Sequence, residues 1–141
     1  MRRRAEVGER GSAAVELTLL TPLLLLLLVF VVALGRLAEA RQQVDDAAAQ
    51  AARAATVAAS VGGAGKTAQQ AASASLASDR ITCSHLSVTT DLSSFGPGDD
   101  VQVQVSCTVS LADLSFLHLP GTETVSSIAS SPVDQYRSVG S

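Results

Sequence analysis

One uninterrupted apolar run dominates the pattern of hydrophobic and polar positions. It covers residues 17–35, LTLLTPLLLLLLVFVVALG, and contains no charged side chain. A helix rises about 1.5 Å per residue, so this run reaches roughly 28 Å, close to the hydrocarbon thickness of a bilayer. The pattern therefore predicts a membrane-spanning helix, in which Pro22 could introduce a kink of the kind that membrane helices tolerate.

The helical pattern continues beyond the apolar run. Residues 36–59 are rich in strong helix formers. An apolar position recurs at every seventh residue: Leu37, Val44, Ala51 and Ala58. A stripe of such small side chains permits close approach, so we expect it to pack on another helix or on a C-terminal sheet. The simplest expectation is one helix of about 45 residues, capped at its start by Ser12.

Glycines and a change of period divide the remainder of the chain. Gly62, Gly63 and Gly65 are expected to end the long helix, and residues 66–79 can form a second one. From Ile81 onward, apolar and polar residues alternate with the period of a strand. The expected elements are strands at 86–89, 101–111 and 122–130, a turn at 93–100, an apolar loop at 111–120 and a tail from residue 131.

These elements predict an α+β protein. A long N-terminal transmembrane helix continues into an Ala-rich helix, followed by a small domain with a short helix and an antiparallel hairpin or three-stranded sheet. The predicted divisions are a leader at 1–11, the helix and its extension at 12–60, the small domain at 61–131 and a tail at 132–141.

Charges beside the apolar run predict its orientation. Four arginines precede the run: Arg2, Arg3, Arg4 and Arg10. Arg36 and Arg41 follow it, but they are mixed with acidic residues. The excess on the N-terminal side predicts a single-pass protein of the cell membrane with a cytoplasmic N-terminus and an extracytoplasmic C-terminal domain.

The two cysteines, Cys83 and Cys107, both lie in the part expected outside the cell. An even number of cysteines in an oxidising compartment favours a disulfide. The alternation places Cys107 on the same buried face as Val103 and Val105, and Cys83 can reach it from just before the first strand. The alternative is a pair of buried free thiols, since a metal site would require more ligands at closer spacing.

Little catalytic or ligand-binding chemistry can be found. The net charge is −3 and no basic cluster occurs after the N-terminus, so nucleic acid is not an expected partner. His85 and His118 have no spaced metal-binding partners. No nucleophile elbow or phosphate-binding loop is present. We therefore expect no enzyme activity, no metal, no cofactor and no small-molecule substrate.

Glu16 is the unusual charge, because it lies where the apolar helix begins. Its carboxylate could sit at headgroup level and complement the helix dipole. It could also meet a cationic partner inside the membrane, where an unpaired carboxylate is costly.

Several short segments resemble the N-terminus of TadE-like proteins. They are Arg-Gly-Ser-Ala-Ala-Val-Glu-Leu at 10–17, Thr21-Pro22 with the Leu run, and the Arg- and Ala-containing stretch 35–53. TadE-like proteins are minor pilins or pseudopilins of the tight-adherence (Flp, type IVb) pilus system. The resemblance is strong over residues 10–59 and weaker over the hairpin and the segment 131–137.

The resemblance implies a specific maturation step. A prepilin peptidase would cut after Gly11, so that Ser12 becomes the first residue and Glu16 the fifth. Glu16 would then form an assembly salt bridge with the N-terminal amine of a neighbouring pilin or pseudopilin. Leu17 stands where major Flp pilins usually carry Tyr, and those pilins are much shorter, so the minor class is indicated. Incorporation into a pilus is left open.

Two other interpretations compete with this one. Ala38-Glu39-Ala40 could be a signal-peptidase site, which would make the chain a secreted protein cut after Ala40. Against it, the apolar run is longer than a usual signal-peptide core and Arg36 intervenes. The third interpretation is an unprocessed, single-span anchored protein that acts as a binding module or scaffold.

Overall fold

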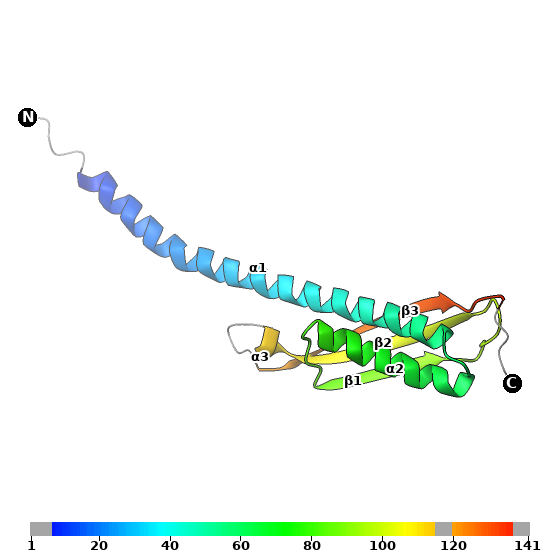
Figure 1. Cartoon of the computed structure of the whole chain (residues 1–141). Coiled ribbons are helices and arrows are strands. Elements are labelled where there is room, and N and C mark those ends of the chain that lie inside the picture. The colour runs from blue at the N-terminus through cyan, green and yellow to red at the C-terminus, as the bar shows by residue number, and fades with distance from the viewer. Residues whose placement is uncertain (1–6, 115–119, 137–141) are drawn as a thin grey trace, which may run out of the picture. The chain divides into compact units, whose positions relative to one another are not determined.

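The computed structural model describes the backbone of residues 7–114 and 120–136, and the side chains within 14–113 and 120–136. The elements follow in the order α1 (Val7–Thr56), α2 (Val61–Ser78), β1 (His85–Asp91), β2 (Asp100–Ser110), α3 (Leu111–Leu114) and β3 (Thr122–Pro132) (Figure 1). The predicted α+β fold with a long N-terminal helix is confirmed. The chain forms two compact units, Met1–Gly35 and Arg36–Ser141, and α1 contributes to both.

The first unit contains the apolar part of α1. This helix is long and apolar enough to cross a membrane, and its apolar window is not buried within the chain. Pro22 lies inside the helix. The helix begins at Val7, so the expectation that Ser12 caps it is wrong. A glycine inside a helix costs only about 1 kcal/mol relative to Ala, and Gly8 and Gly11 therefore do not prevent the helix from extending toward the N-terminus.

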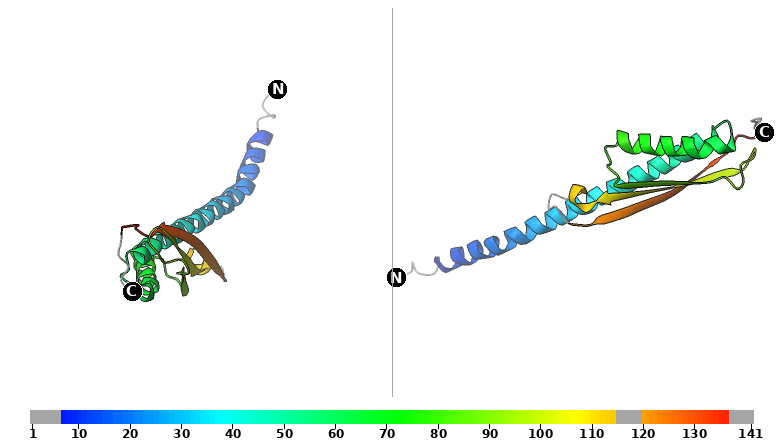
Figure 2. Two further views of the ribbon diagram at one scale, coloured as in Figure 1. Left: turned by 90° about the vertical axis from the view of Figure 1, so that its right-hand side faces the viewer. Right: turned by 90° about the horizontal axis from the view of Figure 1, so that it is seen from below.

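In the second unit, residues 36–56 of α1 and the whole of α2 pack on one face of the sheet (Figure 2). The buried side chains of α1 are Ala40, Val44, Ala47, Ala48, Ala51, Ala52 and Ala55. Those of α2 are mostly alanines as well: Ala64, Ala68, Ala72, Ser75 and Leu76. Apart from Ala40 and Ser75, these side chains share one apolar cluster with the inner face of β2. The predicted stripe is therefore confirmed, and it packs on both a helix and the sheet.

The connection between α1 and α2 differs from the prediction. The helix α1 ends at Thr56, and Gly62, Gly63 and Gly65 lie inside α2 rather than ending the helix before it. Ser60 is the N-cap of α2, and its Oγ accepts a hydrogen bond from the Gly63 N–H at 3.2 Å. A serine N-cap stabilises a helix start by about 1 kcal/mol, which helps to offset the low helix propensity of the glycines.

The sheet is antiparallel with the strand order β1-β2-β3. Val105 of β2 pairs with Val88 of β1 and with Ser127 of β3. Alternate residues of β2 are buried against the helices: Val101, Val103, Val105, Cys107 and Val109. The predicted hairpin and the third strand are thus both present.

The outer face of the sheet is mostly polar, although Ile128 is exposed on it. The Ser106 hydroxyl donates to the Ser126 hydroxyl at 3.0 Å, and the Thr108 and Thr124 hydroxyls are bonded to each other at the same distance. Cross-strand hydroxyl pairs of this kind stabilise a sheet modestly.

The strand β3 extends further than predicted. It runs through Pro132, and the next residue, Val133, is buried with only 2% of its surface exposed. The predicted tail therefore begins too early, because Val133 is an apolar side chain that fills the end of the core beside the turn between β1 and β2.

Candidate functional site: the apolar helix, its carboxylate and the adjoining domain

Glu16 lies near the start of the described part of the apolar helix. It is the only charged residue between Ala14 and Gly35. Its side chain is exposed, and no other described side chain forms a hydrogen bond or ion pair with it. The two hydroxyls nearby are satisfied inside the helix, as Thr18 Oγ1 donates to the Ala14 carbonyl and Thr21 Oγ1 to the Leu17 carbonyl, each at 2.7 Å. Among the described side chains of residues 14–35, the Glu16 carboxylate is therefore the charged group that a partner could meet.

The surface around and after Glu16 is apolar and uncovered. Leu17, Leu26 and Phe30 are 67%, 69% and 60% exposed, and the intervening leucines are similar. Soluble proteins rarely expose a contiguous apolar patch of this extent. A helix satisfies its own backbone polar groups, so it can lie in lipid or against other apolar helices without further partners.

Gly11 and Ser12 lie inside α1, in the part where only the backbone is described. The helix rise places Glu16 about 6 Å along the axis from Ser12, roughly one turn. The structure thus brings the three predicted site residues onto one continuous helix. The proposed cleavage and the proposed salt bridge are not tested by this placement.

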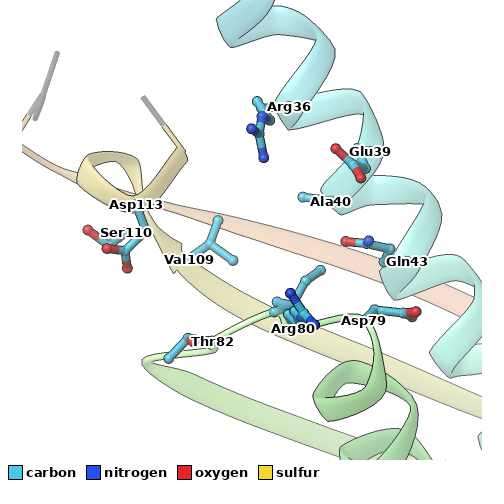
Figure 3. Close-up of a pocket in the computed structure, with 11 residues that line it drawn as sticks. Arg36, Glu39, Ala40, Gln43, Asp79, Arg80, Thr82, Val109, Ser110 and Asp113 are labelled. Carbon is cyan, nitrogen blue, oxygen red and sulfur yellow. The ribbon is translucent and has the colours of Figure 1, made fainter. Parts of the chain in front are cut away.

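Sequence analysis missed a charged pocket in the second unit (Figure 3). It has a volume of about 300 Å³ and is lined from three parts of the fold. Arg36 and Glu39 come from α1, Asp79 and Arg80 follow the end of α2, and Asp113 belongs to α3. These residues are far apart in the sequence and share no motif, so the pattern of the chain gave no signal for this cluster.

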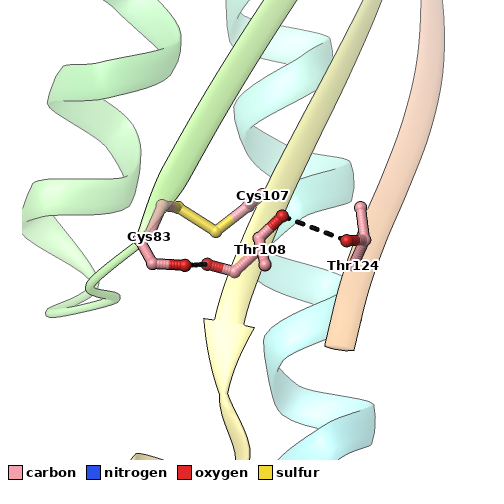
Figure 4. The surroundings of a disulfide bond; sticks show 5 residues. Cys83, Cys107, Thr108 and Thr124 are labelled. Atoms are coloured by element: carbon pink, nitrogen blue, oxygen red, sulfur yellow. Dashed lines mark hydrogen bonds between the residues drawn. A yellow bond between two sulfur atoms is a disulfide. The ribbon is translucent and has the colours of Figure 1, made fainter. Parts of the chain in front are cut away.

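Cys83 and Cys107 form the predicted disulfide (Figure 4). Their Cα atoms are 5.4 Å apart. Cys107 is fully buried in β2, while Cys83 is half-buried just before β1. The bridge thus fastens the entry of the first strand to the core face of the central one.

The other polar residues named above lie apart from one another in the part of the chain that the structure describes. Within the described ranges, no three His, Cys, Asp or Glu side chains are grouped so that they could hold a metal ion. His85 is exposed at the start of β1, and His118 lies outside the described residues. At the end of β1, the Ser93 backbone N–H donates to the Asp91 carboxylate at 3.0 Å and lowers the pKa of that group. This interaction belongs to the turn that follows β1.

An exposed apolar helix joined to a small, disulfide-bridged α+β unit suggests a protein anchored in a membrane by an N-terminal span. Comparison with protein families makes this more specific. Residues 11–53 match the family model of TadE-like protein, which confirms the resemblance and supports a component associated with the Tad pilus system. The match covers both the apolar stretch and most of the buried alanine stripe of α1. No curated protein and no solved structure matches the chain.

Proposed function

We propose that this protein is a minor pilin or pseudopilin that supports assembly of a tight-adherence (Flp, type IVb) pilus. One observation carries the proposal: the TadE-like match begins at Gly11 and runs through the exposed apolar helix that bears Glu16. In pilin-like subunits one such helix has two roles. It first anchors the subunit in the membrane, and it then packs against other subunits. An exposed apolar helix with one carboxylate suits both tasks.

Maturation supplies the partner for that carboxylate. In the proposed reaction, a prepilin peptidase hydrolyses the peptide bond between Gly11 and Ser12 on the cytoplasmic face. The new amine of Ser12 carries a positive charge at neutral pH. In a bundle of staggered helices this amine would face Glu16 of a neighbouring subunit. Such pairing removes most of the penalty of holding a lone carboxylate among apolar side chains.

The disulfide supports the proposed orientation. Disulfides persist in oxidising compartments and are rare in the cytosol. The Cys83–Cys107 bridge lies in the second unit, so this unit would lie outside the cytoplasm. The arginine-rich N-terminus would then remain on the cytoplasmic side, where the peptidase would act.

The structure disfavours the secreted alternative. Cleavage after Ala40 would separate Leu37 and Ala40 from the second unit. Ala40 is only 3% exposed, and Leu37 is packed against the apolar core. The mature chain would therefore lose part of the helix face that the core covers. The unprocessed single-span anchor remains the alternative that a direct measurement must separate from a pilin-like protein.

The N-terminal sequence of the mature chain provides that measurement. The full chain is expressed with and without a prepilin peptidase and recovered from membranes. A pilin-like protein begins at Ser12 only when the peptidase is present. A chain that keeps Met1 or Arg2 with the peptidase present would contradict the proposal, and a chain that begins at Arg41 would identify a secreted protein. Deletion of the protein should then reduce the number of surface pili.

A further inference from the structure

The charged pocket of the second unit contains both signs of charge. Two guanidinium groups, from Arg36 and Arg80, line it together with three carboxylates, from Glu39, Asp79 and Asp113 (Figure 3). Among the described residues, no ion pair joins any two of these five side chains. The pocket therefore presents two cationic and three anionic groups that are free to bind a ligand carrying both charges.

Arg80 occupies this pocket at a cost in backbone conformation. It has φ +58°, in the left-handed region where glycine is usual. The Arg80 N–H donates to the Ala77 carbonyl at 3.2 Å, and the Ile81 N–H donates to the Leu76 carbonyl at 3.0 Å. This is the Schellman arrangement that ends α2, with arginine at the position that most often holds glycine. Glycine would adopt this conformation without strain, so substitution of Arg80 by glycine removes the guanidinium without disturbing the end of α2.

The position of Arg36 along the chain indicates the level of this residue in a membrane. Arg36 directly follows Gly35, the last residue of the uncharged stretch, within an unbroken helix. Glu39 and Gln43 follow within two turns and also line the pocket. Arginine side chains at the end of a membrane span extend toward the phosphates of the lipid headgroups. Arg36 itself is therefore expected at the level of the lipid headgroups.

We propose that this pocket binds the headgroup of an amine-bearing phospholipid, of the phosphatidylethanolamine kind. Arg36 and Arg80 would hold the phosphate, because guanidinium groups form strong charge-assisted bonds with phosphate oxygens. The primary ammonium would be attracted by the carboxylates that line the pocket and would donate hydrogen bonds to the nearest of them. A volume of about 300 Å³ is at the small end of ligand sites and suits a headgroup rather than a larger molecule.

The charges also predict which headgroups bind weakly. Three carboxylates against two guanidinium groups leave the pocket with an excess of negative charge, so an anionic headgroup without an amine meets repulsion. A choline headgroup carries a cation but has no N–H to donate to the carboxylates. The affinity of the pocket should therefore decrease from phosphatidylethanolamine to phosphatidylcholine to phosphatidylglycerol.

Native mass spectrometry of the full chain in detergent micelles tests this order. The probes are phosphatidylethanolamine, phosphatidylcholine and phosphatidylglycerol with identical acyl chains. We expect about fivefold more bound phosphatidylethanolamine than either of the others. Soluble phosphoethanolamine should displace it at high concentration, whereas free phosphate should not. Equal binding of the three lipids, or a preference for phosphatidylglycerol, would overturn the proposal.

Substitutions of the lining residues test whether the pocket causes the preference for phosphatidylethanolamine. Arg36→Gln and Arg80→Gln should abolish the preference for phosphatidylethanolamine. Arg41→Gln is the matched control, since it removes an exposed arginine of the same helix that does not line this pocket, and it should keep the preference. The double variant Glu39→Gln with Asp79→Asn removes two negative charges and should shift the preference to phosphatidylglycerol. If the arginine variants bind lipid like the wild type but no longer co-purify with pilus subunits, the pocket accepts a protein group and the proposal fails.

Arg80→Gly separates binding from folding. Glycine adopts the left-handed conformation without strain, so the Tm of this variant should be equal to or higher than that of the wild type. Its preference for phosphatidylethanolamine should nevertheless be lost. A variant that keeps this preference would show that the Arg80 guanidinium has no part in binding. None of these measurements requires cleavage after Gly11, so the result is independent of the proposed maturation.

Discussion

Ser84 donates two hydrogen bonds to the same acceptor, the carbonyl oxygen of Thr108. The backbone N–H of Ser84 is 2.8 Å from that oxygen and the Ser84 hydroxyl is 3.0 Å from it. The neighbours of these two residues, Cys83 and Cys107, form the disulfide (Figure 4). Three connections therefore join β2 to the segment that precedes β1, and only one of them is covalent.

Loss of the disulfide should destabilise the fold. The two hydrogen bonds of Ser84 should nevertheless keep the segment before β1 beside β2. Cys83→Ala is expected to lower the free energy of unfolding by about 3 kcal/mol, since the bridge closes a long loop in the unfolded chain. Thermal unfolding of the full chain in detergent, followed by circular dichroism, measures the effect. Ser84→Ala removes only the hydroxyl bond and should cost about 1 kcal/mol. Two alkylatable thiols in the exported wild type would show that the bridge does not form in the cell.

Replacing a buried alanine of α1 by a larger side chain should destabilise the fold. Ala51 is completely buried between α1 and the rest of the core, so Ala51→Leu should destabilise the fold by about 2 kcal/mol through overpacking. Ala38→Leu is the matched control, because Ala38 is exposed on the same helix. Its unfolding temperature should stay close to that of the wild type. Equal effects of the two substitutions would mean that the helix face is not tightly packed.

Val133 should contribute to stability although it follows the last strand. Its N–H donates to the Asp99 carbonyl at 2.8 Å and its side chain is buried. Val133→Ala is expected to cost about 2 kcal/mol because it leaves a small cavity. Tyr136→Ala is the control, because Tyr136 is 95% exposed and its loss should change the unfolding temperature little.

Gly11→Val tests the proposed cleavage site. Valine crowds the position immediately before the bond that the peptidase would cut, so the leader should stay attached. Membrane insertion should be unaffected, because the apolar helix is unchanged. Gel mobility and the N-terminal sequence of the membrane-bound chain give the result. Normal removal of the leader from this variant would place the processing site elsewhere.

Glu16→Ala should give the opposite phenotype. The leader should still be removed, since the cut lies about one turn away, but the mature chain would have no carboxylate for the amine of a neighbouring subunit. Co-purification with other pilus subunits should therefore fall, and Glu16→Asp, which retains a carboxylate, should restore part of it. If Glu16→Ala assembles like the wild type, the carboxylate only complements the helix dipole at the membrane surface.

The strongest periodic patterns in the sequence predicted their elements well. The alternation around Val105 identified the central strand, and the seven-residue spacing through Val44 and Ala51 identified the buried face of α1. These signals are local, because each depends on side chains within one element.

The errors arose where distant residues or competing local effects decide the outcome. Glycines at 62–65 suggested a break, yet the N-cap at Ser60 allows a helix to begin before them. Val133 looked like part of a tail because its burial depends on the turn near Asp99. The charged pocket draws on three segments whose proximity only the fold creates.

The Cys83–Cys107 bridge also has a mechanical consequence. In the proposed pilus the protein would be under tension, and a chain under tension lengthens as its domain opens. The bridge keeps the segment between the cysteines, a sequence separation of 24, out of the load path. At about 3.4 Å per residue, roughly 80 Å of extension stays locked while the bridge is intact. Reduction would release this length, so the redox state of the surroundings would set how far the second unit can be stretched.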